Sequence, residues 1–351
     1  MKQPVKAAVI GTGWWATTTH IPALKEHADA ELVALCDIDE ARLAAASSAF
    51  EIERRYTDHV ELLARERPDA VVVATTHATH FTIARDCLEA GAHVLIEKPM
   101  TLTAEDARIL CDLAKRNGRA LLVGYPGNYT QNARKVRKEL ETGRYGQIQI
   151  VQSVFNSYCA DLFAGHDRSD TPGAYAVHGP GDVYSKPEHS GGGHGHLQLT
   201  HAAGLLTFTT GLRTKAVQAR MANHGLPVDL VNVLLVEFEG GGLGTLSGTS
   251  NSFLPSSTLT IGCSNATLEL NLHSGALSIR ETGSERVTLP PNEGVDLRLA
   301  PVRNLIGAAR GTEEPVSTGE VGLGAAEILD AAYRSAREGG RRVAAEELYQ
   351  P

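Results

Sequence analysis

The chain has 351 residues, with 33 Lys and Arg against 41 Asp and Glu, and its formal net charge at pH 7 is −8. The length predicts two domains, and a hydrophobic content of 42% with a charged content of 21% is that of an ordinary globular protein. The negative charge argues against nucleic acid or an anionic membrane as a partner, and no apolar stretch approaches the ~20 residues of a membrane span.

Cysteine usage and the first residues favour a cytoplasmic location. The five cysteines are scattered without a CxxC pair, and an odd, dispersed count is typical of reduced thiols. Lys2 is followed by polar Gln3 and Pro4 rather than by an apolar segment, so a cleavable signal is not expected.

The first element is a strand over residues 5–10 that ends in a glycine-rich turn, Gly-Thr-Gly-Trp-Trp-Ala, at residues 11–16. Gly11 permits the tight turn, Gly13 lets the backbone approach a pyrophosphate, and the following helix N-terminus offers N–H groups to the phosphates. A second apolar run ends at Asp37, which would accept hydrogen bonds from the adenosine ribose and repel a 2′-phosphate. The motif therefore predicts NAD rather than NADP, with contacts from Gly11, Thr12, Gly13, Trp14, Trp15 and Asp37. For at least one of the two tryptophans, packing beneath the loop is the simpler expectation.

Up to residue 125, short apolar runs alternate with amphipathic segments, which predicts a doubly wound parallel sheet of the Rossmann type. Strands are expected over residues 5–10, 31–36, 70–75, 93–97 and 120–125, and helices over 16–27, 40–50, 60–65, 81–90, 104–117 and 131–141. Thr75, Thr76 and His77 close the third strand, where they would approach the ribose and nicotinamide, and His80 is expected at the start of the next helix.

The fourth strand ends in Glu97-Lys98-Pro99. Ligands of an open parallel sheet lie outside the carboxyl ends of its strands, so Lys98 could face the nicotinamide and exchange protons. Glu97 is expected beside the cofactor. The alternative is a surface Lys98 in an ion pair with Glu97, and position alone does not decide between them.

After residue 146, period-two strands dominate and predict a second, α+β domain with an open, mostly antiparallel sheet. The expected domains are 1–124 and 125–351, with helices near 302–309 and 322–337 closing the structure. One uncovered face of such a sheet usually finds a partner, which predicts a homodimer or homotetramer.

Residues 161–195 form a long segment rich in Gly, Pro, Asp and His, and such a loop is usually functional or disordered. Six of the fourteen histidines lie between residues 166 and 201, but HxxxH and HExxH spacings are absent, so no metal is expected. If a helix starts near Gly193, then His194, Gln198 and His201 share one face, which suits a substrate clamp and a proton acceptor. Histidines that cap or pack at a domain interface are the alternative.

With these motifs in place, the chain resembles the Gfo/Idh/MocA oxidoreductases (glucose–fructose oxidoreductase, inositol dehydrogenase and relatives) over nearly its whole length. The resemblance rests on the Gly11-x-Gly13 turn, Glu97-Lys98-Pro99, Val123-Gly124-Tyr125 and the C-terminal run 327–337. It implies NAD(P)-dependent oxidation or reduction of sugars, cyclitols and related polyols.

The family motif of the second domain is Gly-Gly-Gly-x-x-x-Asp-x-Gly-x-His-x-x-Asp. Residues 191–193 and His201 match it, whereas its two Asp positions fall on Leu197 and Gly204. The match implies His201 as acid/base and Lys98 as its neighbour in the proton relay. With the two carboxylates lost, the candidates for substrate contact are Lys98, Tyr125, Asp182, Tyr184, His194, Gln198 and His201, with His196 a further substitute.

Three functions follow from this resemblance. The first is an NAD-dependent dehydrogenase acting on a secondary alcohol of a sugar, cyclitol or glycoside. The second is an enzyme that recycles its NAD while it cleaves or epimerises a glycoside through transient oxidation. The third, a non-catalytic sensor, is disfavoured because Lys98 and His201 occupy the motif positions.

Overall fold

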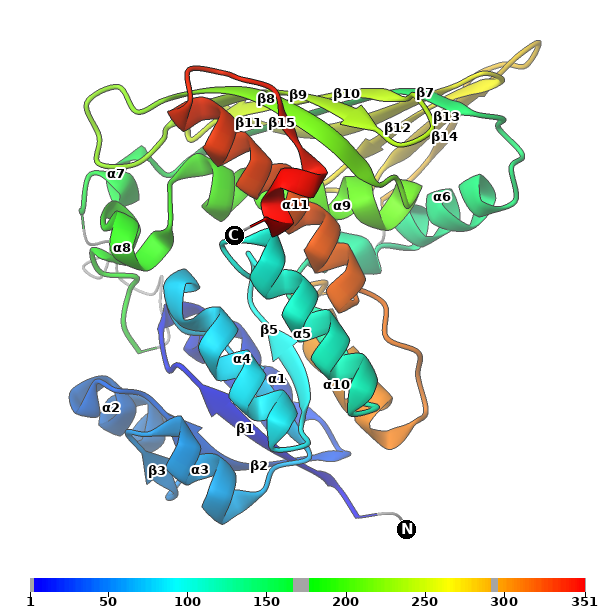
Figure 1. The fold of residues 1–351 in the computed structure, drawn as a ribbon. Helices are drawn as coiled ribbons and strands as arrows, with labels where there is room; N and C mark the ends of the chain where they lie inside the picture. The colour runs from blue at the N-terminus through cyan, green and yellow to red at the C-terminus, as the bar shows by residue number, and fades with distance from the viewer. Residues whose placement is uncertain (1–2, 167–176, 292–295, 351) are drawn as a thin grey trace.

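A computed structural model describes residues 3–166, 177–291 and 296–350, and contains two sheets with helices between and around them (Figure 1). The first sheet has six strands in the order β3-β2-β1-β4-β5-β6, and every neighbouring pair is parallel. The second has nine strands in the order β14-β13-β12-β11-β7-β10-β9-β8-β15, antiparallel except for β7 and β10. The predicted fold class is confirmed.

The parallel sheet and its helices occupy the first part of the chain. Its elements are β1 (Val5–Ile10), η1 (Ala16–His20), α1 (Ile21–Glu26), β2 (Ala30–Cys36), α2 (Glu40–Phe50), β3 (Arg55–Tyr56), α3 (His59–Glu66), β4 (Ala70–Val73), η2 (His77–Thr79), α4 (His80–Glu89), β5 (His93–Ile96), α5 (Ala104–Arg116) and β6 (Leu121–Val123).

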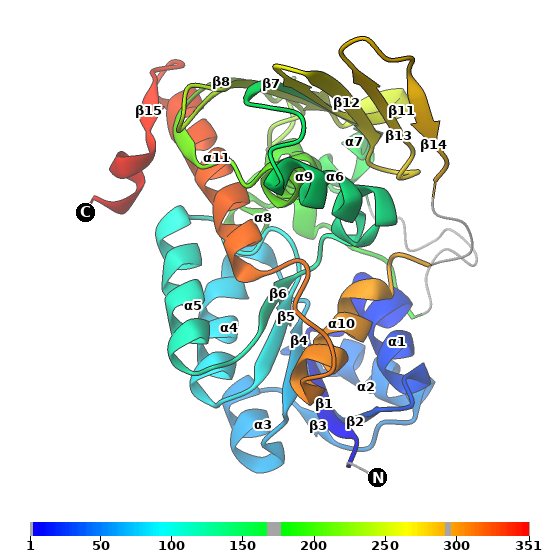
Figure 2. The ribbon, with the colours of Figure 1, turned by 90° about the vertical axis from the view of Figure 1, so that its right-hand side faces the viewer.

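Both faces of the parallel sheet are buried, which is why its central strands β1, β4 and β5 are mostly apolar. Along β1, Ala7 and Val9 pack in one apolar cluster with α1 and α2, whereas Ala8 and Ile10 pack in the other with α3, α4 and α5. The first cluster also takes in Val302, Leu305 and Ile306 of α10 (Ala300–Arg310), so a helix near the C-terminal end of the chain returns to cover the first sheet (Figure 2).

The second sheet follows after residue 147. Its elements and those around it are η3 (Pro126–Tyr129), α6 (Gln131–Glu141), β7 (Ile148–Tyr158), α7 (Ala160–Phe163), η4 (Val183–Ser185), α8 (Pro187–Ser190), η5 (Gly195–Leu199), α9 (Thr200–Thr210), β8 (Thr214–Ala222), β9 (Val231–Phe238), β10 (Leu243–Thr249), β11 (Asn251–Cys263), β12 (Ala266–Asn271), β13 (Leu277–Glu281), β14 (Val287–Leu289), α11 (Gly319–Arg337), β15 (Val343–Ala344) and η6 (Ala345–Tyr349).

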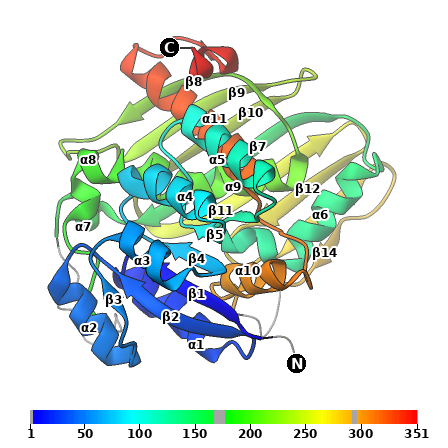
Figure 3. The same cartoon turned by 60° about the horizontal axis from the view of Figure 1, so that its bottom comes forward.

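Helices α6, α9 and α11 lie on one face of the second sheet, between it and the parallel sheet (Figure 1, Figure 3). Strand β9 alternates accordingly: Leu234 and Val236 are buried, whereas Val233 and Leu235 are exposed on the opposite face.

The described part of the segment 161–195 includes most of the short helix α7 and all of η4 and α8. Residues 167–176 of the segment lie outside the described residues. Within the described part of the chain, no helix is long and apolar enough to cross a membrane.

Candidate active site

The glycine turn after β1 has the shape that a dinucleotide needs. Gly11 has a φ of +93°, and a Cβ there would lie 2.4 Å from the carbonyl oxygen of Ala74, so the turn fits tightly against the end of β4. A Cβ on Gly13 would meet no atom within 4 Å, so the space beside the turn is open where a pyrophosphate would approach. The residues present therefore fit NAD.

Asp37, at the end of β2, is buried and fixes the glycine turn. Its Oδ2 accepts hydrogen bonds from the N–H and Oγ1 of Thr12, at 2.8 and 3.0 Å, and its Oδ1 accepts one from the N–H of Asp39 at 3.0 Å. Arg42, in the first turn of α2, places Nε 3.5 Å from Asp37 Oδ2. The sequence analysis missed Arg42, because it considered only the two residues that directly follow Asp37.

The first helix begins with a π-helical turn, η1, which brings two side chains onto one carboxylate. The Nε1 of Trp15 donates to Oε1 of Glu97 at 3.0 Å, and Nε2 of His20 lies 2.9 Å from the same oxygen. Residues five apart point about 140° apart in an α-helix, whereas i→i+5 bonding places them on one side. His20 is a site residue for which the sequence predicted no role in the site.

Glu97 is buried beneath the site rather than exposed to it. Burial opposes its ionisation, but the hydrogen bond and charge of His20 and the charge of Lys98 outweigh burial and lower its pKa to about 2. A Cβ on Gly124 would lie 2.5 Å from Glu97 Oε1, so Gly124 makes room for this carboxylate. Glu97 is therefore a fixed negative charge next to Lys98.

Lys98 reaches from the parallel sheet to the second domain. Its Nζ donates to the carbonyl oxygen of Leu197 in η5 at 3.1 Å, while its backbone N–H donates to Glu97 Oε2 at 3.2 Å. Burial lowers the pKa of Lys98, against the charge of Glu97. The alternative of a surface ion pair between the Lys98 and Glu97 side chains is wrong.

Residues 75–80, which follow β4, form the wall of the site next to Lys98. Thr75 and Thr76 lie in the turn, and Thr79 donates to the Oγ1 of Thr75 at 2.9 Å. His77 Nδ1 lies 2.8 Å from the carbonyl oxygen of Ser190 in α8, which ties this wall to the second domain. His80 is the first residue of α4, as predicted from the sequence. Its ring packs between the carbonyl oxygens of Pro99 and Thr75, at 2.8 and 3.2 Å.

A buried carboxylate that the sequence did not reveal holds the Gly-rich turn ahead of η5. Asp229 accepts hydrogen bonds from the N–H groups of Gly193 and Gly195, at 2.7 and 2.9 Å, and from Tyr333 Oη at 2.8 Å. Burial opposes the charge on Asp229, but these hydrogen bonds hold its pKa below the usual range. A Cβ on Gly192 or Gly195 would lie 2.2 or 2.5 Å from Tyr333 Oη, so glycine is required at both positions.

His201 lies in the first turn of α9 among aromatic rings. It stacks on Phe155 with ring centroids 5.8 Å apart and meets the edge of Tyr125 at 6.0 Å. Within the described part of the chain, the His201 ring nitrogens accept or donate no hydrogen bond. Burial, and then the charge of Lys98, lowers the pKa of His201 to about 3, so the ring is neutral near pH 7.

Tyr125 explains one departure from the family motif. A Cβ on Gly204 would lie 2.8 Å from the Tyr125 ring, which therefore fills the space that a side chain at 204 would need. The Tyr125 hydroxyl bonds Thr200 Oγ1 at 2.8 Å. At the other departure, the Leu197 side chain is buried in an apolar cluster with Cys159.

The helix expected near Gly193 is present, and it begins as the π-helical turn η5. His194 is fully buried, with Nδ1 2.8 Å from Ser250 Oγ, and burial lowers its pKa to about 4. Gln198 donates from Nε2 to Cys159 Sγ at 3.1 Å. His196 is also buried and stacks on Tyr333, with ring centroids 4.3 Å apart.

The two expected residues of the long segment lie apart from this group. Asp182 is exposed and forms an ion pair with Lys186 at 2.7 Å. The ring of Tyr184 lies 6.0 Å from the ring of His77, at the wall formed after β4. Among residues 3–166, 177–291 and 296–350, no group of three or more His, Cys, Asp or Glu is arranged to hold a metal ion.

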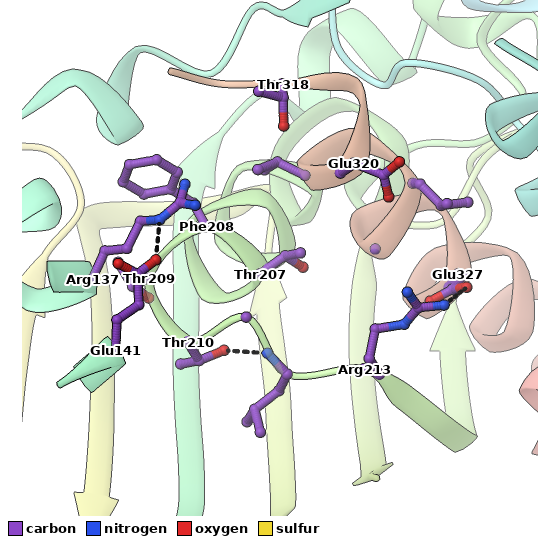
Figure 4. Close-up of a pocket in the computed structure, with 15 residues that line it drawn as sticks. Arg137, Glu141, Thr207, Phe208, Thr209, Thr210, Arg213, Thr318, Glu320 and Glu327 are labelled. Carbon is purple, nitrogen blue, oxygen red and sulfur yellow. Dashed lines mark hydrogen bonds and ion pairs between the residues drawn. The ribbon is translucent and has the colours of Figure 1, made fainter. Parts of the chain in front are cut away.

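A separate pocket of about 220 Å³ lies at the far end of α9 (Figure 4). Arg137 and Glu141 of α6, residues 207–213 and the first half of α11 line it. None of the expected site residues takes part, so this pocket is distinct from the group around Lys98.

Two family models match the chain. Residues 5–125 match the oxidoreductase family with an NAD-binding Rossmann fold, and residues 133–269 match the GFO/IDH/MocA C-terminal domain. The D-apiose dehydrogenase of Paraburkholderia graminis is 26% identical over 350 residues, which cover 95% of this chain and 88% of that one. The D-glucoside 3-dehydrogenase of Escherichia coli is 30% identical over 147 residues, and the match covers 42% of each chain.

Solved structures agree over the whole length. The WlbA dehydrogenase from Bordetella pertussis, in complex with NADH and UDP-GlcNAcA, has a TM-score of 0.77 at 25% identity and covers 97% of this chain and 99% of that one. An inositol dehydrogenase homologue from Azotobacter vinelandii, complexed with NAD+, has the same fold, with a TM-score of 0.82 at 22% identity and 98% of each chain covered. With its dinucleotide turn, its buried Glu97 and Lys98, and both family models matched, the chain belongs to the GFO/IDH/MocA family of NAD-binding oxidoreductases.

Proposed function

We propose that this protein is an NAD-dependent dehydrogenase that oxidises a secondary alcohol of a sugar, cyclitol or glycoside. The observation that carries the proposal is the contact of Lys98 Nζ with the carbonyl oxygen of Leu197, at 3.1 Å. This contact holds a cation at the carboxyl edge of the parallel sheet, beside η5 and the start of α9, where His201 lies. The named relatives act on sugars, which supports the same substrate class here.

In this proposal Lys98 binds the substrate oxygen and His201 accepts its proton. NAD, when bound, supplies the hydride acceptor. Lys98 binds the substrate oxygen through its ammonium group. The negative charge of Glu97 raises the pKa of Lys98 and so favours this charged form. His201 is neutral, and its ring nitrogens make no hydrogen bond to any residue that the structure describes, so it takes the hydroxyl proton as general base. Gln198 and Tyr125 are proposed to orient the substrate beside Lys98 and His201. His194 is buried, with Nδ1 2.8 Å from Ser250 Oγ, and is proposed to hold the start of η5 in place.

The hydrogen-bond acceptors around Lys98 and His201 affect which substrate is preferred. Leu197 and Gly204 place no carboxylate next to His201, and Glu97 is already committed to His20 and Trp15. Hydroxyl groups of a polyol donate most strongly to carboxylates, so this site has fewer strong acceptors than the family motif provides. The preferred sugar therefore has to be found by experiment rather than inherited from a relative.

The test is a substrate panel. Purified protein and NAD are mixed with sugars, inositols and glycosides, nicotinamide absorbance is followed, and products are identified by mass spectrometry. A rise in NADH with an oxidised product supports the proposal. A substrate consumed without NADH, with a broken glycosidic bond or an inverted centre, assigns the NAD-recycling reaction instead, and no turnover of any substrate contradicts both.

We also propose the assembly and the location. The outer face of the second sheet exposes apolar side chains of three adjacent strands, Ile150, Val233, Leu235 and Leu243, which supports a homodimer or homotetramer through this face. The mass in solution, with Leu235→Glu as the disrupting variant, tests this. All five cysteines are unpaired and buried, which supports a cytoplasmic location. The division into domains 1–124 and 125–351 is proposed with α10 as an exception, since it packs on the first sheet.

A further inference from the structure

The proton that His201 accepts in the proposed function does not stay on its ring. Burial, and then the charge of Lys98, lowers the pKa of His201 to about 3, so the protonated ring gives up a proton readily near pH 7. Oxidation of a secondary alcohol breaks one C–H and one O–H bond; the hydride passes to NAD, and the hydroxyl proton has to reach solvent. A second acceptor close to His201 would therefore serve every turnover.

Three titratable side chains act on His201 through their charge, namely Lys98, Glu97 and His273. Lys98 is a cation in the proposed function and has no place for another proton. Both carboxylate oxygens of Glu97 already accept hydrogen bonds, and its pKa of about 2 makes it a weaker acceptor than His201 itself. His273 is the acceptor that remains.

His273 lies in the turn between β12 and β13, against the same phenyl ring as His201. Its ring centroid is 5.3 Å from that of Phe155 in an edge-on contact, and His201 stacks on Phe155 at 5.8 Å. The N–H of Leu272 donates to the carbonyl oxygen of Ser257 in β11 at 3.0 Å. The turn is therefore tied to the sheet, and His273 is held beside Phe155.

His273 is exposed, and among the described residues its ring nitrogens make no hydrogen bond or ion pair. Partial burial lowers its pKa below the ordinary value, so the ring is neutral near pH 7 and can accept a proton. Ser257 pairs with Phe155 across β7 and β11, and within the described part of the chain its buried Oγ has no hydrogen-bond partner. A hydroxyl both accepts and donates, so a polar group able to carry a proton lies beside the phenyl ring.

We propose that His273 is the proton exit of the site: it takes the proton from His201 and releases it to solvent. The inference rests on the proposed function, since only a net oxidation releases a proton. The N–H bond of the protonated His201 breaks, an N–H bond forms on His273, and water or a buffer base then removes that proton, so both rings return to the neutral form. His273 contacts no reacting atom and acts only through His201.

The experiment is a single turnover with the substrate found in the panel, in weakly buffered solution, with NADH absorbance and a pH indicator followed together. In the wild type, NADH and the released proton should appear at the same rate. In His273→Gln, NADH should form at the wild-type rate because His201 still accepts the proton. Proton release should lag roughly tenfold, a smaller effect than the ~10²-fold contribution of a positioned general base. Added imidazole, a small base that can replace the lost ring, should remove the lag in proportion to its concentration.

His224→Gln is the matched control, because His224 is an exposed histidine in the link between β8 and β9 and should show no lag. Trp14 and Trp15 are the only tryptophans of the chain, so quenching of their fluorescence by NADH shows that each variant is folded. If His273→Gln does not bind NADH, His273→Asn takes its place and the same outcomes apply.

Two results would overturn the inference and leave the proposed function standing. In one, His273→Gln releases the proton together with NADH at the wild-type rate. In the other, both signals slow equally and imidazole does not restore them, which would make His273 a structural residue. NADH formed from no substrate of the panel overturns the proposed function and this inference together, because no proton is then released.

Discussion

At the scale of single residues, the site depends on how the protein surrounds His201. A histidine near neutral pH is a common proton acceptor, but here Phe155 and Tyr125 pack against the ring, and no carboxylate among the described residues hydrogen-bonds to it. The residue type of His201 and its place in the motif could be predicted from the sequence. Its aromatic neighbours could not, because Phe155 comes from a strand of the second sheet and Tyr125 follows the last strand of the first sheet.

His201→Ala should lower turnover by ~10²-fold or more, because a positioned general base typically contributes that much. Binding of NADH, followed through the fluorescence of Trp14 and Trp15, should stay unchanged. The measurement is the initial rate of NADH formation with the substrate found in the panel. Equal turnover in the variant and the wild type would remove His201 from the proposed mechanism.

The low pKa of His201, about 3, predicts the pH dependence of oxidation. The neutral form that accepts a proton is already fully populated at pH 5.5, so kcat/KM should not fall as the pH drops from 7.5 to 5.5. A free histidine would instead lose most of its base form below pH 6.5. Initial rates over this range decide between the two, and an acid limb near pH 6.5 that His201→Gln removes would contradict the enclosed ring described here.

At the scale of elements, most of the fold could be predicted. Helices α2 and α6 and strand β1 have the expected bounds, because clear local signals mark their ends: the side chains of Asp39 and Thr130 cap the two helices, and the turn at Gly11 ends β1. Three short edge strands, β3, β14 and β15, were missed, since two or three residues carry no period. The π-helical turns were missed for another reason: an extra residue per turn is imposed by tertiary contacts and leaves no local pattern.

Asp229 shows what the spacing of residues cannot reveal. It lies in the link between β8 and β9, far along the chain from the glycines that it binds, so no motif connects them. Asp229→Asn leaves a backbone donor or the Tyr333 hydroxyl without its acceptor, and the free energy of unfolding should fall by about 1–3 kcal/mol. Urea unfolding measures this, with Asp112→Asn, an exposed carboxyl of α5, as the matched control.

The same variant should affect activity through position. The hydrogen bonds of Asp229 to Gly193 and Gly195, here called the Asp229 clamp, fix the start of η5. The carbonyl oxygen of Leu197 in η5 accepts a hydrogen bond from Lys98, so kcat should fall more than the affinity for NADH does. If both variants lost the same stability and Asp229→Asn kept full kcat, the clamp would be purely structural. Tyr333→Phe, which removes one of the three donors, should give an intermediate result.

At the scale of the whole molecule, the sequence does not show which sheet each late helix covers. The amphipathic pattern of α10 requires an apolar neighbour, but the pattern is the same whether that neighbour is the first sheet or the second. The structure places α10 on the first sheet and α11 between the two. Such long-range choices depend on surface complementarity that no local pattern encodes.

Five histidines whose pKa is lowered by burial in the folded state predict how stability changes with pH. They are His77, His80, His194, His196 and His201. Below about pH 6.5 the unfolded chain binds protons that the native chain does not, so the free energy of unfolding falls as the pH drops. Each histidine contributes up to ~1.4 kcal/mol per pH unit in this window.

Urea midpoints at pH 7.5 and 5.5 check this expectation. The midpoint should be clearly lower at pH 5.5, and the exposed His224, changed to Gln, should leave the difference as it is. Carboxylates such as Glu97 cannot produce a loss in this range, because their unfolded pKa of about 4.5 lies below it. An unchanged midpoint would mean that the histidines are protonated in the folded protein.

The π-helical turn η1 lets two side chains five residues apart, Trp15 and His20, share the Glu97 carboxylate. The same residues wound as an α-helix would point about 140° apart, and Glu97 would keep only one of the two partners. A one-residue deletion within residues 16–20 would instead leave Trp15 and His20 four apart, about 40° from each other in an α-helix, so the pair would still face one side. This buried segment can therefore become one residue shorter and keep both contacts with Glu97, whereas exchange of either side chain removes one of them.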